Sequence, residues 1–312
     1  MAASMGEHGI AEDLARWHHD GAVILEHFLS PDEIAPVRAD CDALFAGRRA
    51  QEAPIDRKAG GGIGSFDTAQ FLNQEQLPFA ASPAINLIGL HPRLIAFARA
   101  ALGVTQVHLY QCDAWAKFTG EADYDQPFHC DFANHTLTVP GDDPADRTIN
   151  FMIYVTDVTN DLGAIHYVPN PDAAPIIGRD RLPVPGGPDN MQQALKAQEK
   201  SGAAPAGSVF TYGIDVYHRG TNLTRPGGHR YTITASYKAA GNDMIGRAAW
   251  PLHFLRPWTN LFANATPEQL ACLGIPLPGD RFWTETTLAR TQRRWPDWDM
   301  TAYVRAMAPM GI

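Results

Sequence analysis

The stretch Phe128-His129-Cys130-Asp131-Phe132 carries the strongest chemical signal in the chain. Side chains alternate across a β-strand, so a strand here would place His129 and Asp131 on one face, about 6.5–7 Å apart along it. Phe128, Cys130 and Phe132 would point to the other face, where Cys130 is expected to be a buried apolar residue. An imidazole and a carboxylate so placed can bind one small cation. Two ligands alone are weak evidence, so a metal site requires a third ligand elsewhere.

That third ligand is present much later in the chain, at His218. Non-haem Fe(II) oxygenases hold their metal with two histidines and one carboxylate on one face, which leaves three positions for substrate and oxygen. His129 and Asp131 would supply the close pair, and a later strand would bring in His218. The segment His18-His19-Asp20 also spells His-x-Asp, but it lies at a predicted helix end, where residues two apart face different ways. We therefore do not expect a metal there.

Arg230 begins a strand whose two faces differ in polarity. One face carries polar residues and the other apolar ones: Arg230, Thr232, Thr234 and Ser236 against Tyr231, Ile233, Ala235 and Tyr237. In a small barrel the polar face would line an interior cavity, where a guanidinium can hold a carboxylate through two parallel hydrogen bonds. The alternatives are a surface salt bridge, or Arg225 as the anchor, although the turn 225–228 would leave Arg225 in solvent.

The segment 104–240 is typical of an antiparallel sandwich or barrel, because it contains short strands and turn signals. The predicted strands are 107–110, 114–118, 128–132, 149–155, 208–212, 216–218 and 230–237. Pro and Gly are frequent in 168–190, which predicts a long excursion outside the core, followed by a short helix near 190–200.

The flanking segments are predicted to be helical. A helix is predicted over 9–20 and a strand over 22–25. Ser30-Pro31-Asp32-Glu33 then has the residues of a capping box, which starts a further helix. Another helix is predicted over 92–102 and ends at Gly103. Residues 48–75 predict a flexible loop; its Gly-rich run 59–64 lacks the Lys-Ser/Thr of a phosphate loop. The tail is Trp-rich and partly helical, with a second capping box at 266–269. We expect one domain over 1–312: a helical part (1–103), a core (104–240) and a C-terminal extension (241–312).

Composition excludes several classes of protein. The net charge of -9 over 312 residues argues against a nucleic-acid-binding surface. The sequence contains no apolar run of 18 residues, so no membrane-spanning helix is predicted. The N-terminus lacks the basic and apolar regions of a signal peptide. The cysteines are scattered with no CxxC spacing, which argues against a zinc knuckle or a disulfide framework and favours a reducing cytoplasm. They are Cys41, Cys112, Cys130 and Cys272.

Taken together, these motifs resemble the phytanoyl-CoA dioxygenase family of Fe(II)/2-oxoglutarate oxygenases over roughly residues 15–240. The segments that carry the resemblance are 128–132, Val216-Tyr217-His218-Arg219-Gly220-Thr221-Asn222, Arg230 and the opening 20–25 with 30–33. The resemblance implies a mainly β fold with α additions, built on a double-stranded β-helix (a cupin-like jelly roll) with N-terminal and C-terminal helices. It also implies that His129, Asp131 and His218 bind Fe(II).

The resemblance further implies how 2-oxoglutarate binds. Arg230 would bind its distal carboxylate, and Lys117 matches a basic position that contacts this cosubstrate in some members. Two departures are visible. Members often have Ser where this chain has Gly220, so Thr221 is expected to supply the hydroxyl, and 165–170 stands where many members have Pro-Gly-Ser-His. His135 and His166 are candidates for contact with the substrate.

The implied reaction oxidises a small organic metabolite, with hydroxylation foremost, and converts 2-oxoglutarate and O₂ to succinate and CO₂. Related halogenases replace the metal-binding carboxylate by a small residue, so an intact Asp131 favours hydroxylation, desaturation or ring formation. The alternative is a cupin-like barrel that holds Zn²⁺ or acts as a sensor without oxidation; Arg230 argues against it, because a bare zinc site does not need a guanidinium. A metal-independent hydrolase is disfavoured by the lack of a G-x-S-x-G elbow.

Overall fold

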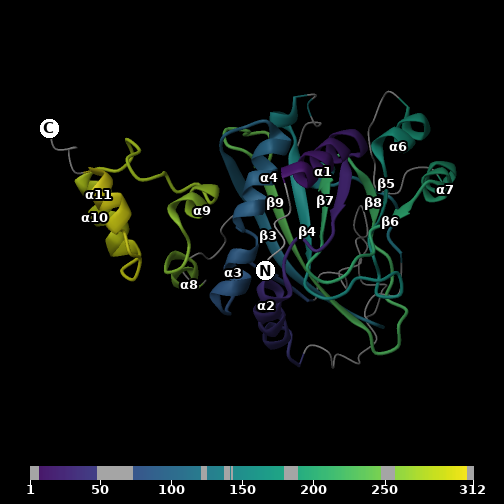
Figure 1. The fold of residues 1–312 in the computed structure, drawn as a ribbon, viewed down its shortest axis with the longest axis horizontal. Helices are drawn as coiled ribbons and strands as arrows, with labels where there is room; N and C mark the ends of the chain where they lie inside the picture. The colour runs from purple at the N-terminus through teal and green to yellow at the C-terminus, as the bar shows by residue number, and fades with distance from the viewer. Residues whose placement is uncertain are drawn as a thin grey trace, which may run out of the picture.

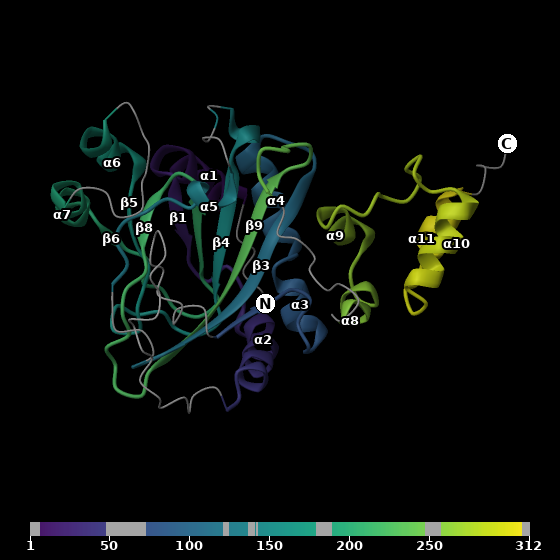
Figure 2. The ribbon, with the colours of Figure 1, turned by 180° about the vertical axis from the view of Figure 1, so that it is seen from behind.

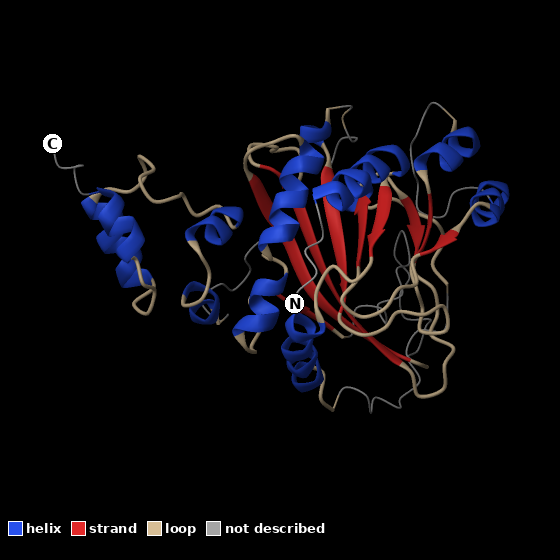
Figure 3. Cartoon of the chain, viewed as in Figure 1, coloured by secondary structure: helices blue, strands red, loops and turns tan. Residues whose placement is uncertain are grey.

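Two antiparallel sheets carry the fold in the computed structural model (Figures 1 and 3). The structure describes residues 7–47, 73–120, 125–136, 141, 143–178, 189–246 and 257–307. The larger sheet has the strand order β1-β7-β4-β9-β3-β2 and the smaller one β6-β5-β8. This pair of sheets, with helices around it, confirms the predicted double-stranded β-helix. The Gly-rich run 59–64 and most of the predicted loop 48–75 lie outside the described residues.

The strands follow the predicted pattern closely, apart from the 128–132 stretch. Their bounds are β1 Ala22–Leu25, β2 Gln74–Gln76, β3 Val107–Phe118, β4 Thr148–Tyr154, β5 His166–Val168, β6 Lys200–Ser201, β7 Val209–Gly213, β8 Tyr217–Arg219 and β9 His229–Ala239. The two strands predicted over 107–118 are one strand, because a bulge between Leu109 and Gln111 lets pairing with β9 continue past the irregularity. β1, predicted in the N-terminal part, joins the larger sheet beside β7.

The prediction of a strand over 128–132 is wrong beyond His129. His129 forms an isolated bridge with His218, and the chain then turns at Asp131, which has helical dihedrals (φ -73°, ψ -18°). The helix α5 (Phe132–His135) follows at once, and the Phe132 N–H donates to the Ile214 carbonyl. The turn is therefore stabilised by a distant segment. The turn brings the Asp131 side chain to the same side as that of His129. The strand alternation that was predicted to do this is not present.

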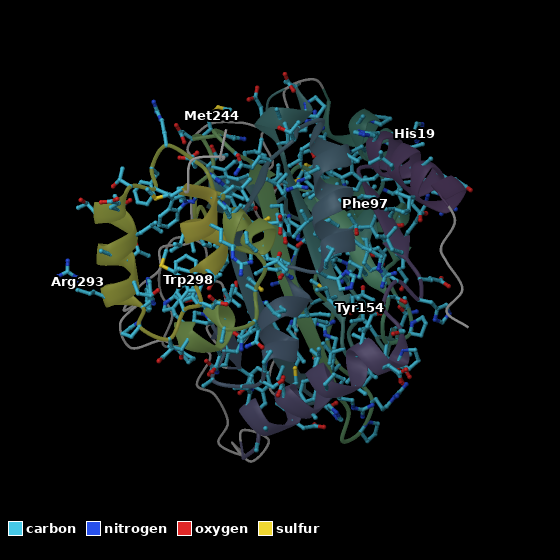
Figure 4. All side chains as sticks on the ribbon, turned by 60° about the vertical axis from the view of Figure 1, so that its left-hand side comes forward. His19, Phe97, Tyr154, Met244, Arg293 and Trp298 are labelled. Carbon is cyan, nitrogen blue, oxygen red and sulfur yellow. The ribbon has the colours of Figure 1, made fainter. Side chains whose placement is uncertain are left out.

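Helices cover the outer face of the larger sheet (Figures 1 and 3). The helices on this face are α1 Glu7–Asp20, α2 Pro31–Leu44, α3 Pro83–Ile88 and α4 Pro92–Leu102. The other helices are α6 Asn170–Ile177, α7 Asp189–Ala197, α8 Trp258–Phe262, α9 Pro267–Cys272, α10 Glu285–Arg294 and α11 Thr301–Met307. α4 ends as predicted at Gly103, whose φ of +64° favours glycine. Figure 4 shows Phe97 of α4 in the interior, where its ring meets that of Phe151 edge-on at 6.1 Å.

The faces of β9 divide as predicted. Tyr231, Ile233, Ala235 and Tyr237 belong to the main hydrophobic core under the helices, whereas the polar face is turned to the interior of the double-stranded β-helix. The excursion 168–190 is less separate from the core than predicted. It contains α6, and Ala173 of α6 packs with Leu195 of α7 in a second buried cluster that includes Phe128.

The C-terminal part is Trp-rich and helical, as predicted. Trp258, Trp283 and Trp298 belong to the main core cluster, and Figure 1 places α10 and α11 beyond α8 and α9, at the side away from the smaller sheet.

The assignment of the whole chain to one domain stays a prediction. All four cysteines are buried, and none of them forms a disulfide bond. Within the described ranges, no helix has the length and apolar character needed to cross a bilayer.

The capping box at the start of α2 yields a test of stability. Ser30 accepts a hydrogen bond from the Glu33 N–H, and the Glu33 carboxylate accepts from the Ser30 N–H while it also contacts His91 and Arg93. Partial burial raises the pKa of Glu33, but the bonds from Ser30, the bond from His91 and the charge of Arg93 outweigh it and lower this pKa to about 2. The carboxylate therefore stabilises the fold fully above pH about 4.5 and loses this effect as the pH falls toward 2.

We expect Glu33→Gln to lower the free energy of unfolding by about 0.5–1 kcal/mol at pH 7, a value discounted for solvent exposure. The difference from the unsubstituted protein should vanish near pH 2, which urea unfolding at several pH values would measure. Glu268→Gln, in the first turn of α9, is the matched control. It should have a smaller effect, since no described Lys, Arg or His forms an ion pair with Glu268. A constant difference across the pH range would contradict this account.

Candidate metal centre

The backbones of His129 and His218 are joined by two hydrogen bonds. Each N–H donates to the carbonyl of the other residue, with N···O distances of 3.0 Å in both directions. This bridge extends the edge of the smaller sheet at β8 and places the two imidazole rings 4.5 Å apart between centroids. Two histidines that are distant in the sequence are thereby brought to one place.

Both imidazoles present the same nitrogen to the site. The Nδ1 of His129 lies 2.9 Å from the Pro127 carbonyl, and the Nδ1 of His218 lies 2.9 Å from the Val216 carbonyl. A carbonyl only accepts, so each Nδ1 carries a proton and each Nε2 faces the site. The adjacent Asp131 carboxylate raises the pKa of His218 in spite of its burial, so metal binding at this ring displaces protons from its Nε2. The Asp131 Oδ1 lies 3.9 Å from the Nε2 of His129 and 3.4 Å from that of His218.

The three groups form a compact donor set. One ligand atom from each of His129, Asp131 and His218 lies within 4.8 Å of the other two, and no second group of this kind occurs in the parts of the chain that the structure describes. Two imidazole nitrogens and one carboxylate oxygen, with a cavity on one side, are the donors of a facial triad for non-haem Fe(II). The donor set therefore fits the iron implied by the sequence.

Charge interactions within the site are strong because it is buried. Burial alone raises the pKa of Asp131, but the adjacent imidazole of His218, followed by His135 and His129, outweighs burial and holds this pKa well below its usual range. Burial lowers the pKa of His129, and the neighbouring His218 lowers it further. The carboxylate is therefore ionised and His129 is neutral, which are the forms that bind a metal.

The side chain of Tyr212 holds the Asp131 carboxylate in place. The Tyr212 hydroxyl donates to the Asp131 Oδ2 at 3.1 Å, which leaves Oδ1 for the metal, and the Tyr212 ring packs against that of His218 at 4.9 Å. The sequence identified Tyr212 only as a strand residue. Tyr212 shares a face of β7 with Phe210, and this pattern gives no sign that its hydroxyl reaches a metal ligand some eighty positions earlier in the chain. Reasoning from the sequence therefore missed the role of Tyr212.

The donor set opens into a cavity of about 420 Å³ between the two sheets. Polar side chains of β3 and β9 form one wall, and they stand opposite each other in register: Lys117 with Arg230, Trp115 with Thr232, and Gln111 with Ser236. Other lining residues are Gln126, His135, Met152, Ile165, Tyr212, Gly220 and Thr234, together with the three donors. The polar face of the 230–237 strand thus lines a cavity, as the alternation predicts.

Arg230 is a buried cation without a carboxylate partner among the described residues. It is 6% exposed, its guanidinium donates to the Gly163 carbonyl through Nη1, and its Nε has no hydrogen-bond partner there. Burial lowers its pKa to about 10, so it remains protonated at neutral pH. A buried charge that lacks a counter-ion is costly, and an anionic ligand in the cavity would remove that cost. The residue therefore fits a dicarboxylate such as 2-oxoglutarate.

The remaining candidates from the sequence divide between the cavity and its surroundings. His135 lines the cavity, and its Nδ1 lies 2.8 Å from the Tyr110 hydroxyl. His166 lies outside the lining, 3.2 Å from the Glu199 carboxylate. Thr221 is also outside it, because its hydroxyl donates to the Ala164 carbonyl at 2.7 Å. A role of Thr221 in binding the cosubstrate stays a prediction.

Gly220 lies against the side chain of Gln126. A Cβ at residue 220 would lie 2.8 Å from the side-chain oxygen of Gln126, which accepts a hydrogen bond from the Gly220 N–H. A serine there would require the end of the Gln126 side chain to shift. Arg225, the rival anchor, is exposed and paired with Asp161, as its turn predicts. In the segment 18–20, the His19 Nδ1 lies 2.7 Å from the Asp20 carboxylate, and these residues belong to no group of metal-ligand spacing among the described residues.

The hydrogen bond from the Tyr212 hydroxyl to Asp131 can be tested by substitution. We expect Tyr212→Phe to weaken Fe(II) binding by about 10- to 100-fold, because partners of a ligating carboxylate have effects of this size on metal affinity. Anaerobic metal titration measures it. Tyr237→Phe is the matched control, since this equally buried tyrosine donates to the Gly89 carbonyl in the core. Equal affinities in the two variants would show that the Tyr212 bond to Asp131 is dispensable.

Comparison with solved structures shows the same fold in several proteins. The epimerase SnoN, solved with Fe³⁺, alpha-ketoglutarate and nogalamycin RO, matches with a TM-score of 0.55 and 16% identity, over 80% of this chain and 90% of SnoN. EctD from S. alaskensis, solved with 2-oxoglutarate and 5-hydroxyectoine, matches with a TM-score of 0.55 and 20% identity, over 80% and 82% of the two chains. AviO1 from Streptomyces viridochromogenes Tue57 has a TM-score of 0.52 and 18% identity, over 76% and 96%.

The sequence comparisons identify the family. No curated protein matches the sequence. The family model described as phytanoyl-CoA dioxygenase (PhyH) matches residues 17–226, a range that includes His129, Asp131 and His218 and ends just before Arg230. This match covers more than half of the chain, and the solved structures agree with it in fold. The chain therefore belongs to the phytanoyl-CoA dioxygenase family of Fe(II)/2-oxoglutarate-dependent oxygenases.

Proposed function

We propose that this chain is a dioxygenase that oxidises a small organic metabolite, with hydroxylation as the outcome, and releases succinate and CO₂ from 2-oxoglutarate. The observation that carries the proposal is the presence of the donor set and the unpaired Arg230 guanidinium in one cavity. The donor set is suited to a metal ion. The buried guanidinium is suited to an anionic cosubstrate, which a metal-binding protein without oxidation does not need.

Each residue has a definite task in this proposal. His129 and His218 bind Fe(II) through Nε2 and Asp131 binds it through Oδ1, while Arg230 binds the distal carboxylate of 2-oxoglutarate. Lys117 lines the cavity directly opposite Arg230 and adds a second positive charge at that end. When bound, iron with 2-oxoglutarate and O₂ supplies the oxidising chemistry that inserts oxygen into a C–H bond. The burial of the site excludes bulk water from it.

The substrate occupies the other end of the cavity. The pair Arg230 and Lys117 and the pair Ser236 and Gln111 are six register positions apart along β9 and β3, which is about 20 Å. The described lining at the Gln111 end offers an amide, the Ser236 hydroxyl and the His135 imidazole, and both cations of the lining lie at the Arg230 end. This distribution supports a substrate whose buried part is uncharged and forms hydrogen bonds. His135 is the residue best placed to contact it, whereas His166 is engaged with Glu199.

Turnover of the cosubstrate tests the reaction class. The purified protein, given Fe(II) and 2-oxoglutarate in air, should form succinate, and Asp131→Ala should reduce the rate to background because one of three metal donors is lost. Asp161→Ala, which removes an exposed partner of Arg225, is the matched control and should keep the rate. Full succinate formation by Asp131→Ala would refute the proposed metal site.

The guanidinium of Arg230 provides a second test. Arg230→Lys should raise the KM for 2-oxoglutarate by roughly 10- to 100-fold, since an ammonium cannot replace the paired hydrogen bonds of a guanidinium. Steady-state kinetics with varied 2-oxoglutarate measures this change. Arg225→Lys is the control, because Arg225 is exposed and lies outside the cavity. If both variants have the KM of the unsubstituted protein, the cosubstrate carboxylate is bound elsewhere.

A further inference from the structure

We propose that Gln192 of α7 is a positioning residue for the metal centre, acting through the backbone next to His129. The Gln192 Oε1 accepts a hydrogen bond from the Phe128 N–H at 2.8 Å, and its Nε2 donates to the Phe128 carbonyl at 3.1 Å. One side-chain amide thus satisfies both backbone groups of the residue that precedes a metal ligand. The inference rests on the metal site of the proposed function and is independent of which substrate is oxidised.

The amide stands where a neighbouring strand would stand. In an extended chain, the backbone groups of consecutive residues point to opposite edges. His129 uses its N–H and carbonyl to pair with His218 on one edge, so the Phe128 groups point to the other edge, where Gln192 meets them. Residues 125–128 belong to no strand. Gln192 therefore supplies, from a helix, the lateral support that a longer strand would have provided.

The same peptide unit also orients the imidazole. The bond between Pro127 and Phe128 carries the carbonyl that receives Nδ1–H from His129 and the N–H that donates to Gln192. A peptide unit is rigid and planar, so fixing its N–H fixes the direction of its carbonyl. Gln192 thus holds the acceptor that selects the tautomer and the ring orientation of His129. The chain of contacts runs from the Gln192 amide through one peptide to the Nε2 that faces the metal.

The region around α7 also holds the segment that contains His218. Arg219 is 5% exposed and pairs with Glu199, just after α7, through two bonds of 2.8 and 3.1 Å, and with Asp125 at 2.9 Å. Its guanidinium lies 5.5 Å from the centre of the Phe128 ring. Phe128 and Arg219, which are adjacent to the two histidine ligands, therefore both form hydrogen bonds to the segment 192–199.

The helix that presents Gln192 is itself anchored. Leu195, one turn further along α7, is fully buried in the cluster that contains Phe128 and Cys130. Figure 2 shows α6 and α7 beside β5, β6 and β8, at the side of the molecule away from α10 and α11. The amide is thus presented from a packed element, which is what positioning of a metal ligand requires.

Cobalt binding by the metal-free protein tests the proposal without catalysis. Gln192→Met keeps the length of the side chain and a good helix former but removes both hydrogen bonds. We expect it to weaken Co²⁺ binding at least 10-fold, the lower end of effects seen for outer-shell partners of metal ligands. Gln193→Met is the matched control, because Gln193 is the next residue of α7, lines a surface pocket together with Gln192 and makes no hydrogen bond to a described residue. It should bind Co²⁺ as the unsubstituted protein does.

Thermal unfolding of the metal-free variants separates positioning from simple stabilisation. The titrations are run well below the unfolding midpoints, so that only folded protein is measured. Gln192→Asn keeps the amide on a shorter side chain and should have a Co²⁺ affinity between those of Gln192→Met and the unsubstituted protein. Unchanged affinity in both Gln192 variants, whether or not the midpoint falls, overturns the proposal. Failure of the unsubstituted protein to bind Co²⁺ would instead refute the metal site itself.

Discussion

The pair of backbone hydrogen bonds between His129 and His218 is the constraint on which the site depends. It joins a short extended segment to the edge strand of the smaller sheet and fixes the spacing of two imidazoles. The turn at Asp131 then brings a carboxylate oxygen within 4.8 Å of both ligand nitrogens. Two flanking bonds continue this pairing, because the Gln126 N–H donates to the Gly220 carbonyl and the Phe132 N–H donates to the Ile214 carbonyl. The bridge itself is the contact that joins the two ligand residues directly.

Charge divides the cavity into regions with different tasks. The Asp131 carboxylate lies among three imidazoles that lower its pKa, while the positive guanidinium of Arg230 is buried without a carboxylate of its own. A dication fits beside the carboxylate, and a dicarboxylate fits between that metal and the guanidinium. The wall near Gln111 and Ser236 lacks a charge in the described lining, which leaves it for an organic substrate. The proposed function therefore has the cosubstrate at the Arg230 end of the cavity, the metal beside Asp131 and the organic substrate toward the Gln111 end.

The sequence predicted the elements that depend on local pattern and residue chemistry. Alternation predicted the faces of β9, capping residues predicted the starts of α2 and α9, and the types of side chain selected His129, Asp131 and His218, which the fold brings together. The features that it missed depend on distant contacts. The helix after Asp131 begins where Phe132 reaches Ile214, the Thr221 hydroxyl is taken by Ala164, and the amide of Gln192 reaches Phe128 across 64 positions.

The visible spectrum of the anaerobic protein tests the central claim most directly, because it reports the metal and the cosubstrate together. Addition of both Fe(II) and 2-oxoglutarate to the metal-free protein should produce a weak visible band that neither addition produces alone. The band should require one equivalent of each. Saturating binding of Fe(II) with no such band in the presence of 2-oxoglutarate would show that the triad holds a metal without its cosubstrate, and would contradict the account.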